Sequence, residues 1–183
     1  MTAPVRVLAV DDRRENLLAL QAILEGLPIE VVAVTSGEEA LKKLLVNDFA
    51  VILLDARMPG MDGFETARHV KQRERTRHIP ILFLTAADYD AHMAFRGYQA
   101  GAVDYITKPF DPWVLRSKVA VFVDLYRLHT EVAQRAAEQD ALRKGVDEAL
   151  ALLDAAEPVD EATSTLVERL RDALGALRHD QAW

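Results

Sequence analysis

Five short apolar runs, each followed by an amphipathic stretch, alternate over the first two thirds of the chain. Apolar runs of this length are typical of buried strands, and leucines three and four residues apart indicate helices that bury one face. Five consecutive strand–helix units predict an α/β domain with a doubly wound parallel sheet. The expected strands span 5–10, 30–34, 50–55, 79–85 and 102–106, and the expected helices span 13–26, 36–47, 63–75, 88–100 and the stretch from 111 onwards.

Local signals place some of the helix ends. Ser36 followed by Glu39 has the spacing of a capping box at the start of the second helix. Gly101 is expected to end the fourth helix, because glycine is favoured just past a helix C-terminus. Asp111 and Pro112 suit the cap and the first position of the last helix.

Polar side chains stand where four of the five expected strands end. Asp11 and Asp12 follow the first strand, and Asp55 ends the third. Thr85 ends the fourth strand, and Lys108 lies just past the fifth. In an open parallel sheet the functional crevice lies beyond the carboxyl ends of the strands. Three carboxylates, a hydroxyl and an ammonium group are therefore expected to converge on one rim.

Such a cluster predicts a bound cation. Carboxylates gathered in one place repel one another, and a divalent ion relieves that repulsion. The chain has no cysteine, and its five histidines lack ligand spacing, so oxygen ligands and Mg²⁺ are favoured. An aspartate in this setting can attack a phosphoryl donor, while the metal and Lys108 neutralise the transferred charge. Thr85 can then bond a phosphoryl oxygen.

Four segments resemble the signature motifs of the receiver domains of response regulators in two-component signal transduction. They are Ala9-Val-Asp-Asp12, Leu53-Leu-Asp-Ala-Arg-Met-Pro-Gly-Met-Asp-Gly63, Leu84-Thr-Ala86 and Asp104-Tyr-Ile-Thr-Lys-Pro-Phe110. Their order and spacing are those of the family, and the resemblance covers residues 5 to about 123. It implies the flavodoxin-like receiver fold with strand order 2-1-3-4-5, and a histidine kinase as the phosphoryl donor.

The resemblance also implies roles for the acidic positions. Asp55 corresponds to the phosphoacceptor, and Asp11 and Asp12 correspond to the acidic metal-binding pair. Arg57 stands where the family lends a backbone carbonyl to Mg²⁺. Taken alone, the Asp11-Asp12 pair would be explained equally well as a turn and helix cap, but the other matching positions make that reading a minor one.

Three further positions match the family. Thr85 and Tyr105 occupy the switch positions, and Lys108 occupies the phosphate-binding position. The Lys108–Pro109 bond is expected to be cis, as in most members of the family. Tyr105 has a plainer alternative, as a half-buried aromatic side chain of a strand.

Charge separates the chain into two parts, a receiver domain over 1–123 and a helical extension over 124–183. The first part holds 16 acidic and 15 basic residues, and the extension holds 13 acidic and 7 basic ones. A DNA-binding output domain would show the opposite balance. The basic stretch from Arg68 to Arg77 is predicted to be a solvated helix end, because Glu74 interrupts it and it lacks aromatic residues. No nucleic-acid partner is expected.

The last helix shows no stop signal for over thirty residues, until Glu157-Pro158. Gly145 weakens it by about 1 kcal/mol relative to alanine, which allows a kink or short break. A row of positions with alternating spacings of three and four is apolar at eight of its ten members, which is compatible with a coiled coil carrying a polar break. Its members are Val121, Leu125, Leu128, Val132, Arg135, Gln139, Leu142, Val146, Ala149 and Leu153.

A second helix is expected over about 160–178, begun by Asp160 or Ser164. It repeats the same spacing at Leu166, Leu170, Ala173 and Leu177. The two helices suggest an antiparallel hairpin, and two hairpins can form a four-helix bundle across a homodimer. A monomeric hairpin folded back on its own receiver is the alternative.

No apolar run approaches the ~20 residues of a membrane helix, and the start of the chain has no signal pattern, so a cytoplasmic protein is expected. Residues 124–183 lack recognisable DNA-binding or catalytic motifs, so we expect no enzyme activity beyond self-phosphorylation and autodephosphorylation. The leading hypothesis is a response regulator that accepts a phosphoryl group on Asp55 and switches protein interaction or dimer geometry through its C-terminal helices.

Two other functions stay open. The chain can be the sensory receiver fragment of a longer enzyme whose output domain lies beyond Trp183. It can also be a phosphate shuttle, in which His129 or His179 exchanges a phosphoryl group with Asp55, although isolated surface histidines are commoner than phosphotransfer sites.

Overall fold

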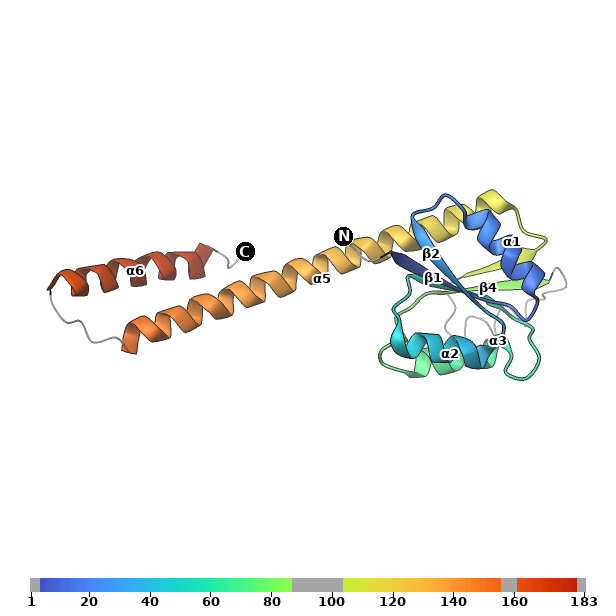
Figure 1. Cartoon of the computed structure of the whole chain (residues 1–183), viewed down its shortest axis with the longest axis horizontal. Coiled ribbons are helices and arrows are strands. Elements are labelled where there is room, and N and C mark those ends of the chain that lie inside the picture. Colours follow the sequence, from blue (N-terminus) through green and yellow to red (C-terminus); the bar gives the residue numbers. More distant parts are fainter. Residues whose placement is uncertain (1–3, 87–103, 156–160, 181–183) are drawn as a thin grey trace. The chain divides into compact units, whose positions relative to one another are not determined.

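A computed structural model describes residues 4–86, 104–155 and 161–180 of the chain. Its centre is a sheet of five parallel strands in the order β2-β1-β3-β4-β5 (Figure 1). This confirms the predicted doubly wound sheet and its strand order. The strands are β1 (Val5–Val10), β2 (Ile29–Val34), β3 (Val51–Asp55), β4 (Ile81–Ala86) and β5 (Asp104–Lys108).

Helices cover both faces of the sheet (Figure 1). On one face Leu20 and Leu115 belong to a buried apolar cluster with β1, β3 and β4. On the other face Leu44 and Val70 belong to a second cluster with the same three strands. All residues of β3 are buried, as expected for a central strand covered on both sides. The helices concerned are α1 (Arg14–Leu24) and the start of α5 (Pro112–Ala155) on the first face, and α2 (Gly37–Val46) and α3 (Gly63–Gln72) on the second.

The fifth strand lies further along the chain than predicted. Its ladder with β4 continues to the pair Ala86 and Lys108, so Lys108 ends the strand instead of following it. The fourth predicted helix, 88–100, and its expected stop at Gly101 lie outside the described residues.

The end of α3 and the cap of α2 also differ from the prediction, and α1 ends at Leu24 instead of 26. The α3 helix ends at Gln72 instead of 75, and the Thr76 hydroxyl donates a hydrogen bond to the Val70 carbonyl near that end. At the start of α2, Ser36 Oγ accepts a hydrogen bond from Glu39 N at 3.2 Å, as predicted. The Glu39 carboxylate, however, accepts from the Thr35 amide and not from that of Ser36, so the capping box is displaced by one residue.

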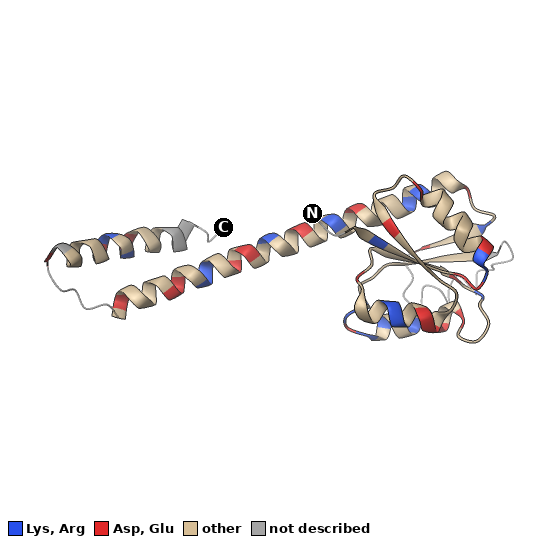
Figure 2. Ribbon diagram, viewed as in Figure 1, with Lys and Arg blue, Asp and Glu red and all other residues tan. Residues whose placement is uncertain are grey.

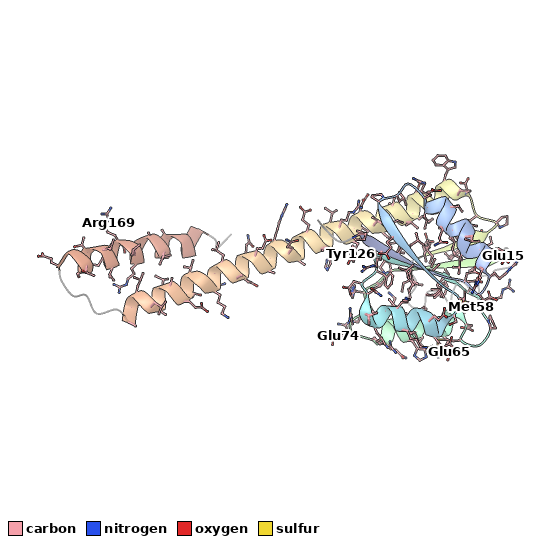
Figure 3. The ribbon with its side chains drawn as sticks, in the orientation of Figure 1. Glu15, Met58, Glu65, Glu74, Tyr126 and Arg169 are labelled. Atoms are coloured by element: carbon pink, nitrogen blue, oxygen red, sulfur yellow. The ribbon has the colours of Figure 1, made fainter. Side chains whose placement is uncertain are left out.

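The start of α5 follows the prediction. Asp111 Oδ1 accepts a hydrogen bond from Trp113 N at 2.7 Å, and Pro112 is the first helical residue. The helix continues without a break through Gly145 to Ala155. Within its first turns Tyr126, labelled in Figure 3, packs against the apolar cluster of the sheet.

The chain divides into two compact units, Met1–Leu128 and His129–Trp183. The second unit contains the end of α5 and helix α6 (Glu161–Asp180). Arg171 Nε lies 2.9 Å from Asp154 Oδ1, which requires α6 to fold back along α5. Among the described parts of the chain, no helix is both long enough and apolar enough to cross a membrane.

The face that α6 turns to α5 is not the predicted one. Leu166, Leu170 and Ala173 are exposed, whereas Val167 and Leu174 are partly buried. Val167, Arg171 and Leu174 share a face, so the ion pair of Arg171 with Asp154 orients this side toward α5. The predicted fourth member of the row, Leu177, is a helical position whose side chain lies outside the description.

Candidate functional site

Three carboxylates meet where β1 and β3 end. Asp11 and Asp12 directly follow β1, and Asp55 is the last residue of β3. The two strands are neighbours and pair in register up to Val10 and Leu54, so the residues that follow are brought together. Carboxylate oxygens of the three aspartates lie within 4.8 Å of one another. Asp11 is fully buried and Asp55 nearly so, whereas Asp12 faces solvent.

Lys108 brings a positive charge into this cluster. Its Nζ lies 2.7 Å from Asp11 Oδ2 and 3.3 Å from Asp55 Oδ1. The Lys108–Pro109 peptide bond is cis, as expected. The predicted convergence of these four side chains at one rim of the sheet is therefore present. One ammonium group among three carboxylates leaves the cluster negatively charged when all are ionised.

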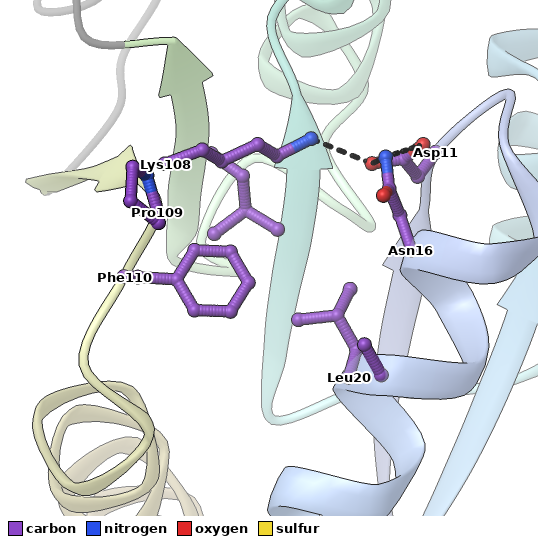
Figure 4. Close-up of a pocket in the computed structure, with 8 residues that line it drawn as sticks. Asp11, Asn16, Leu20, Lys108, Pro109 and Phe110 are labelled. Carbon is purple, nitrogen blue, oxygen red and sulfur yellow. Dashed lines mark hydrogen bonds and ion pairs between the residues drawn. The ribbon is translucent and has the colours of Figure 1, made fainter.

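The buried Asp11 carboxylate is held by groups that the sequence analysis did not single out. Asn16 Nδ2 lies 2.8 and 2.9 Å from its two oxygens (Figure 4). The Arg13 backbone N–H donates to Oδ1 at 3.0 Å. Asn16 is the third residue of α1, and the first turn of this helix stands beside the end of β1. Asn16 lies in the first turn of a helix that begins just after the two aspartates. This position along the chain is the signal from which its contact with Asp11 could have been predicted.

Thr85 carries a buried hydroxyl next to the cluster. Its neighbour Leu84 pairs with Asp55 across β3 and β4, which places Thr85 at the same rim. Its side chain is almost fully buried, and within the described residues Oγ1 has no hydrogen-bond partner. A buried hydroxyl without a partner is costly, so an oxygen of a bound group would stabilise it.

The other predicted switch residue is less enclosed. Tyr105 lies on β5 and is the register partner of Phe83 on the neighbouring strand β4. It is 38% exposed. Thr85 lies two residues beyond Phe83, so Thr85 and Tyr105 occupy the same face of the sheet. This placement allows both the switch role and the plainer role of a partly exposed strand aromatic, and the switch role of Tyr105 stays a prediction.

The loop after β3 approaches Asp55 closely. A β-carbon on Gly63 would lie 2.2 Å from the Asp55 carbonyl oxygen, and the Gly63 amide donates to the Ala56 carbonyl at 3.2 Å. The following helix is capped by Asp62, whose side chain accepts from the Glu65 amide at 2.8 Å. Glycine at 63 thus lets the loop that contains Arg57 pass directly beside the cluster.

Burial raises the pKa of the Asp55 carboxyl, because it disfavours the charged form. The Lys108 ammonium opposes this rise, and the nearby Asp11 carboxylate adds to it. A hydrogen bond from the Arg57 backbone N–H also favours the ionised form. A second cation at the cluster would therefore stabilise the Asp55 carboxylate.

A cavity of about 250 Å³ adjoins the cluster (Figure 4). It lies between α1 and the segment that joins β5 to α5. Asp11, Asn16 and Lys108 form its polar end, and the rest is apolar, with Ala19, Leu20, Leu84, Pro109 and Phe110. The Lys108 side chain therefore reaches the carboxylates along the edge of an apolar hollow.

Residues 7–120 match the family model described as the response regulator receiver domain. Response regulator PleD of Caulobacter vibrioides (strain NA1000 / CB15N) is 37% identical over 141 residues, which are 77% of this chain and 30% of PleD. Sensor histidine kinase GacS of Pseudomonas protegens is 36% identical over 140 residues, which are 75% of this chain and 15% of GacS. The chain thus spans less than a third of the length of either relative.

The solved structure of Vibrio cholerae chemotaxis protein CheY4 is also similar. It is 32% identical, its TM-score is 0.61, and the likeness covers 66% of this chain and 99% of that one. Almost the whole of that molecule therefore corresponds to about two thirds of this chain.

Proposed function

Since the chain belongs to the response regulator receiver domain family of two-component systems, we propose that it is a response regulator whose Asp55 accepts a phosphoryl group from a histidine kinase. One observation carries this proposal. The ammonium group of Lys108 contacts both Asp11 and Asp55 at the rim where the three carboxylates meet. An acceptor oxygen and a charge-neutralising group are thus side by side.

The proposed step is a displacement at phosphorus. A carboxylate oxygen of Asp55 forms a bond to the phosphorus of a phosphohistidine, and the phosphorus–nitrogen bond breaks. The imidazole nitrogen leaves with the electron pair and takes up a proton. Lys108 Nζ balances the charge of the phosphoryl oxygens, and Thr85 Oγ1 donates a hydrogen bond to one of them. Water later hydrolyses the acyl phosphate, which restores the carboxylate and releases inorganic phosphate.

We propose Mg²⁺ as the cofactor, held by Asp11, Asp12, Asp55 and the backbone carbonyl of Arg57. The cluster offers only oxygen ligands and carries more negative than positive charge, which suits a hard divalent cation. When bound, the ion neutralises charge on the phosphoryl oxygens. The raised pKa of Asp55 agrees with this assignment, because a bound cation would offset the cost of burying the carboxylate.

We propose that phosphorylation shifts an equilibrium between two receiver conformations. Thr85 Oγ1 turns toward the phosphoryl group, and the Tyr105 ring moves inward on the same face of the sheet. The output is an interaction made through the C-terminal helices, including a change in dimer geometry, and not a second enzyme activity.

Labelling with a small-molecule phosphodonor tests the acceptor. The wild-type chain is expected to take up phosphate only with Mg²⁺ present, in a bond that hydroxylamine cleaves, as it cleaves acyl phosphates. Asp55→Asn should take up none, whereas Asp48→Asn, which changes an exposed carboxylate paired with Arg75, should behave as wild type. Equal labelling of wild type and Asp55→Asn would overturn the assignment.

A second candidate is the receiver part of a longer signalling protein. It is favoured by the short share of PleD and GacS that this chain spans. In that case Asp55 is still the acceptor, and the output activity belongs to sequence outside these 183 residues. The length of the protein in cell extracts, detected with an antibody to the receiver, distinguishes the two candidates.

A further inference from the structure

One face of α5 carries a row of apolar side chains that the described parts of the chain leave uncovered. Its apolar members are between 54 and 65% exposed, which is unusual for a continuous row of large apolar residues. We call this row the α5 stripe. It consists of Val121, Leu125, Leu128, Val132 and Leu142, interrupted by Arg135 and Gln139.

Among the described residues, the same row has a partner only at its C-terminal end. Val146, Ala149 and Leu153 continue the spacing, and all three are partly buried. Here α6 folds back along α5, as the ion pair of Asp154 with Arg171 requires. The helix face that α6 occupies from Val146 onward is therefore left open by the described residues between 121 and 142.

The spacing of the α5 stripe matches a left-handed coiled coil. Leu125, Val132 and Gln139 take the a positions, and the other members, Val121, Leu128, Arg135 and Leu142, take the d positions. Val132 at an a position, with Leu128 and Leu142 at d positions, has the combination that favours two-stranded parallel coiled coils. We propose that the α5 stripe is the seam of a parallel, in-register coiled coil between two copies of this chain. The inference deepens the proposed output through the C-terminal helices and rests on it.

Flanking charges favour the parallel orientation. The g positions hold Asp124, Glu131 and Glu138, and the e positions include His129 and Arg143. Both signs of charge alternate along this part of α5 (Figure 2). In a parallel pair each g residue faces the following e residue of the other strand, so Glu138 faces Arg143 of the partner subunit. In an antiparallel pair the g positions face one another, which brings acidic residues together.

The two polar positions define the register. Arg135 pairs with Glu131 of the same helix at 2.8 Å, so its charge is balanced where it enters the seam. In register, Gln139 meets Gln139 of the partner subunit, and the two amides can hydrogen-bond. Any other register would place Arg135 or Gln139 against an apolar layer, at a cost in free energy.

Single cysteines test the orientation, because the native chain has none. Leu128→Cys and Leu142→Cys are expected to form disulfide-linked dimers under mild oxidation of the full chain. Ala133→Cys and Ala141→Cys, exposed positions outside the seam, should remain unlinked. The two seam positions are 14 residues apart, roughly 21 Å along a helix. An antiparallel pair cannot self-link at both, so linkage at one alone, at neither, or equally at the control positions would overturn the inference.

Light scattering provides a second, independent measurement. Wild type should have twice the chain mass of 20.4 kDa, Leu128→Asp should have the single mass, and Ala133→Asp should match wild type. A wild-type chain of single mass, both unphosphorylated and with the phosphate mimic beryllofluoride plus Mg²⁺, would overturn the coiled coil. Phosphate labelling of Asp55 in parallel samples without beryllofluoride keeps the two proposals separate: labelled monomers contradict only the coiled coil, and unlabelled dimers contradict only the acceptor assignment.

Discussion

Lys108 Nζ lies 2.7 Å from Asp11 Oδ2, although the two residues are 97 positions apart in the chain. Asp11 follows β1 and Lys108 ends β5, and β3 and β4 lie between these strands in the sheet. The lysine side chain therefore spans the ends of two intervening strands to reach the carboxylate cluster. This contact links the first and last strands of the receiver through the site itself.

Replacing Lys108 with alanine should strengthen Mg²⁺ binding and slow phosphoryl transfer. Without the ammonium group the cluster is more negative, so Mg²⁺ should bind more tightly in a calorimetric titration. Labelling of Asp55 should slow by about 100-fold or more, because the charge of the transferred group loses a preorganised partner. Lys144→Ala, on an exposed part of α5, is the control. Weaker Mg²⁺ binding in Lys108→Ala would contradict this account of the cluster.

Asn16→Ala should destabilise the receiver. The change removes an amide that donates to both oxygens of a fully buried carboxylate and leaves that carboxylate with the Arg13 N–H and Lys108. A hydrogen bond to a charged group contributes about 1.5–3 kcal/mol, so a loss of this order is expected. Urea unfolding without Mg²⁺ measures the loss. Asn47→Ala, at the exposed end of α2, removes a single surface hydrogen bond and should cost clearly less. Equal losses in the two variants would show that Asn16 does not support Asp11.

Gly63→Ala and Gly145→Ala should change the stability of the protein in opposite directions. A β-carbon at 63 would lie 2.2 Å from the Asp55 carbonyl oxygen, so the backbone must shift, at a cost of about 1–3 kcal/mol. It should also slow the labelling of Asp55. A β-carbon at 145 meets nothing within 4 Å, and there alanine should stabilise α5 by about 0.5–1 kcal/mol. Thermal unfolding of both variants checks the signs, and a neutral Gly63→Ala would refute the close approach.

The raised pKa of Asp55 predicts a pH dependence of stability. The folded state holds the proton of Asp55 more tightly than the unfolded state does, so stability falls as pH rises from the ordinary carboxyl pKa through the raised one. Asp55→Asn removes this effect. The variant should be more stable than wild type above the raised pKa, and the difference should shrink below pH 3.8. Urea unfolding of both proteins across this window, without Mg²⁺, measures it.

Added Mg²⁺ should reduce the difference in stability between Asp55→Asn and wild type. Ionised Asp55 is stabilised by the cation, so the advantage of Asp55→Asn at neutral pH should diminish or reverse as Mg²⁺ is titrated. If Asp55→Asn is more stable than wild type by the same amount across both the pH series and the Mg²⁺ series, burial of the Asp55 charge is not the cause of the difference.

Much of the receiver followed from local pattern. Buried strands such as β3 are apolar up to their last residue, and amphipathic helices repeat their apolar residues every three or four positions, so both can be recognised within a short stretch. The side chains at the strand ends, Asp11, Asp55 and Lys108 among them, could be placed at one rim because parallel strands all end on the same side. These predictions require only the order of the residues along the chain, and no knowledge of which residues contact one another.

Other features depended on contacts between distant residues. Asn16 reaches Asp11 only because α1 returns beside the end of β1, and α6 exposes Leu166 because Arg171 meets Asp154. The amino-acid pattern therefore settles which stretches form strands and helices and which side chains stand at their ends. Packing settles which of those side chains touch, since the free energy of a contact depends on the shape and charge of both partners, and no single stretch of sequence contains both.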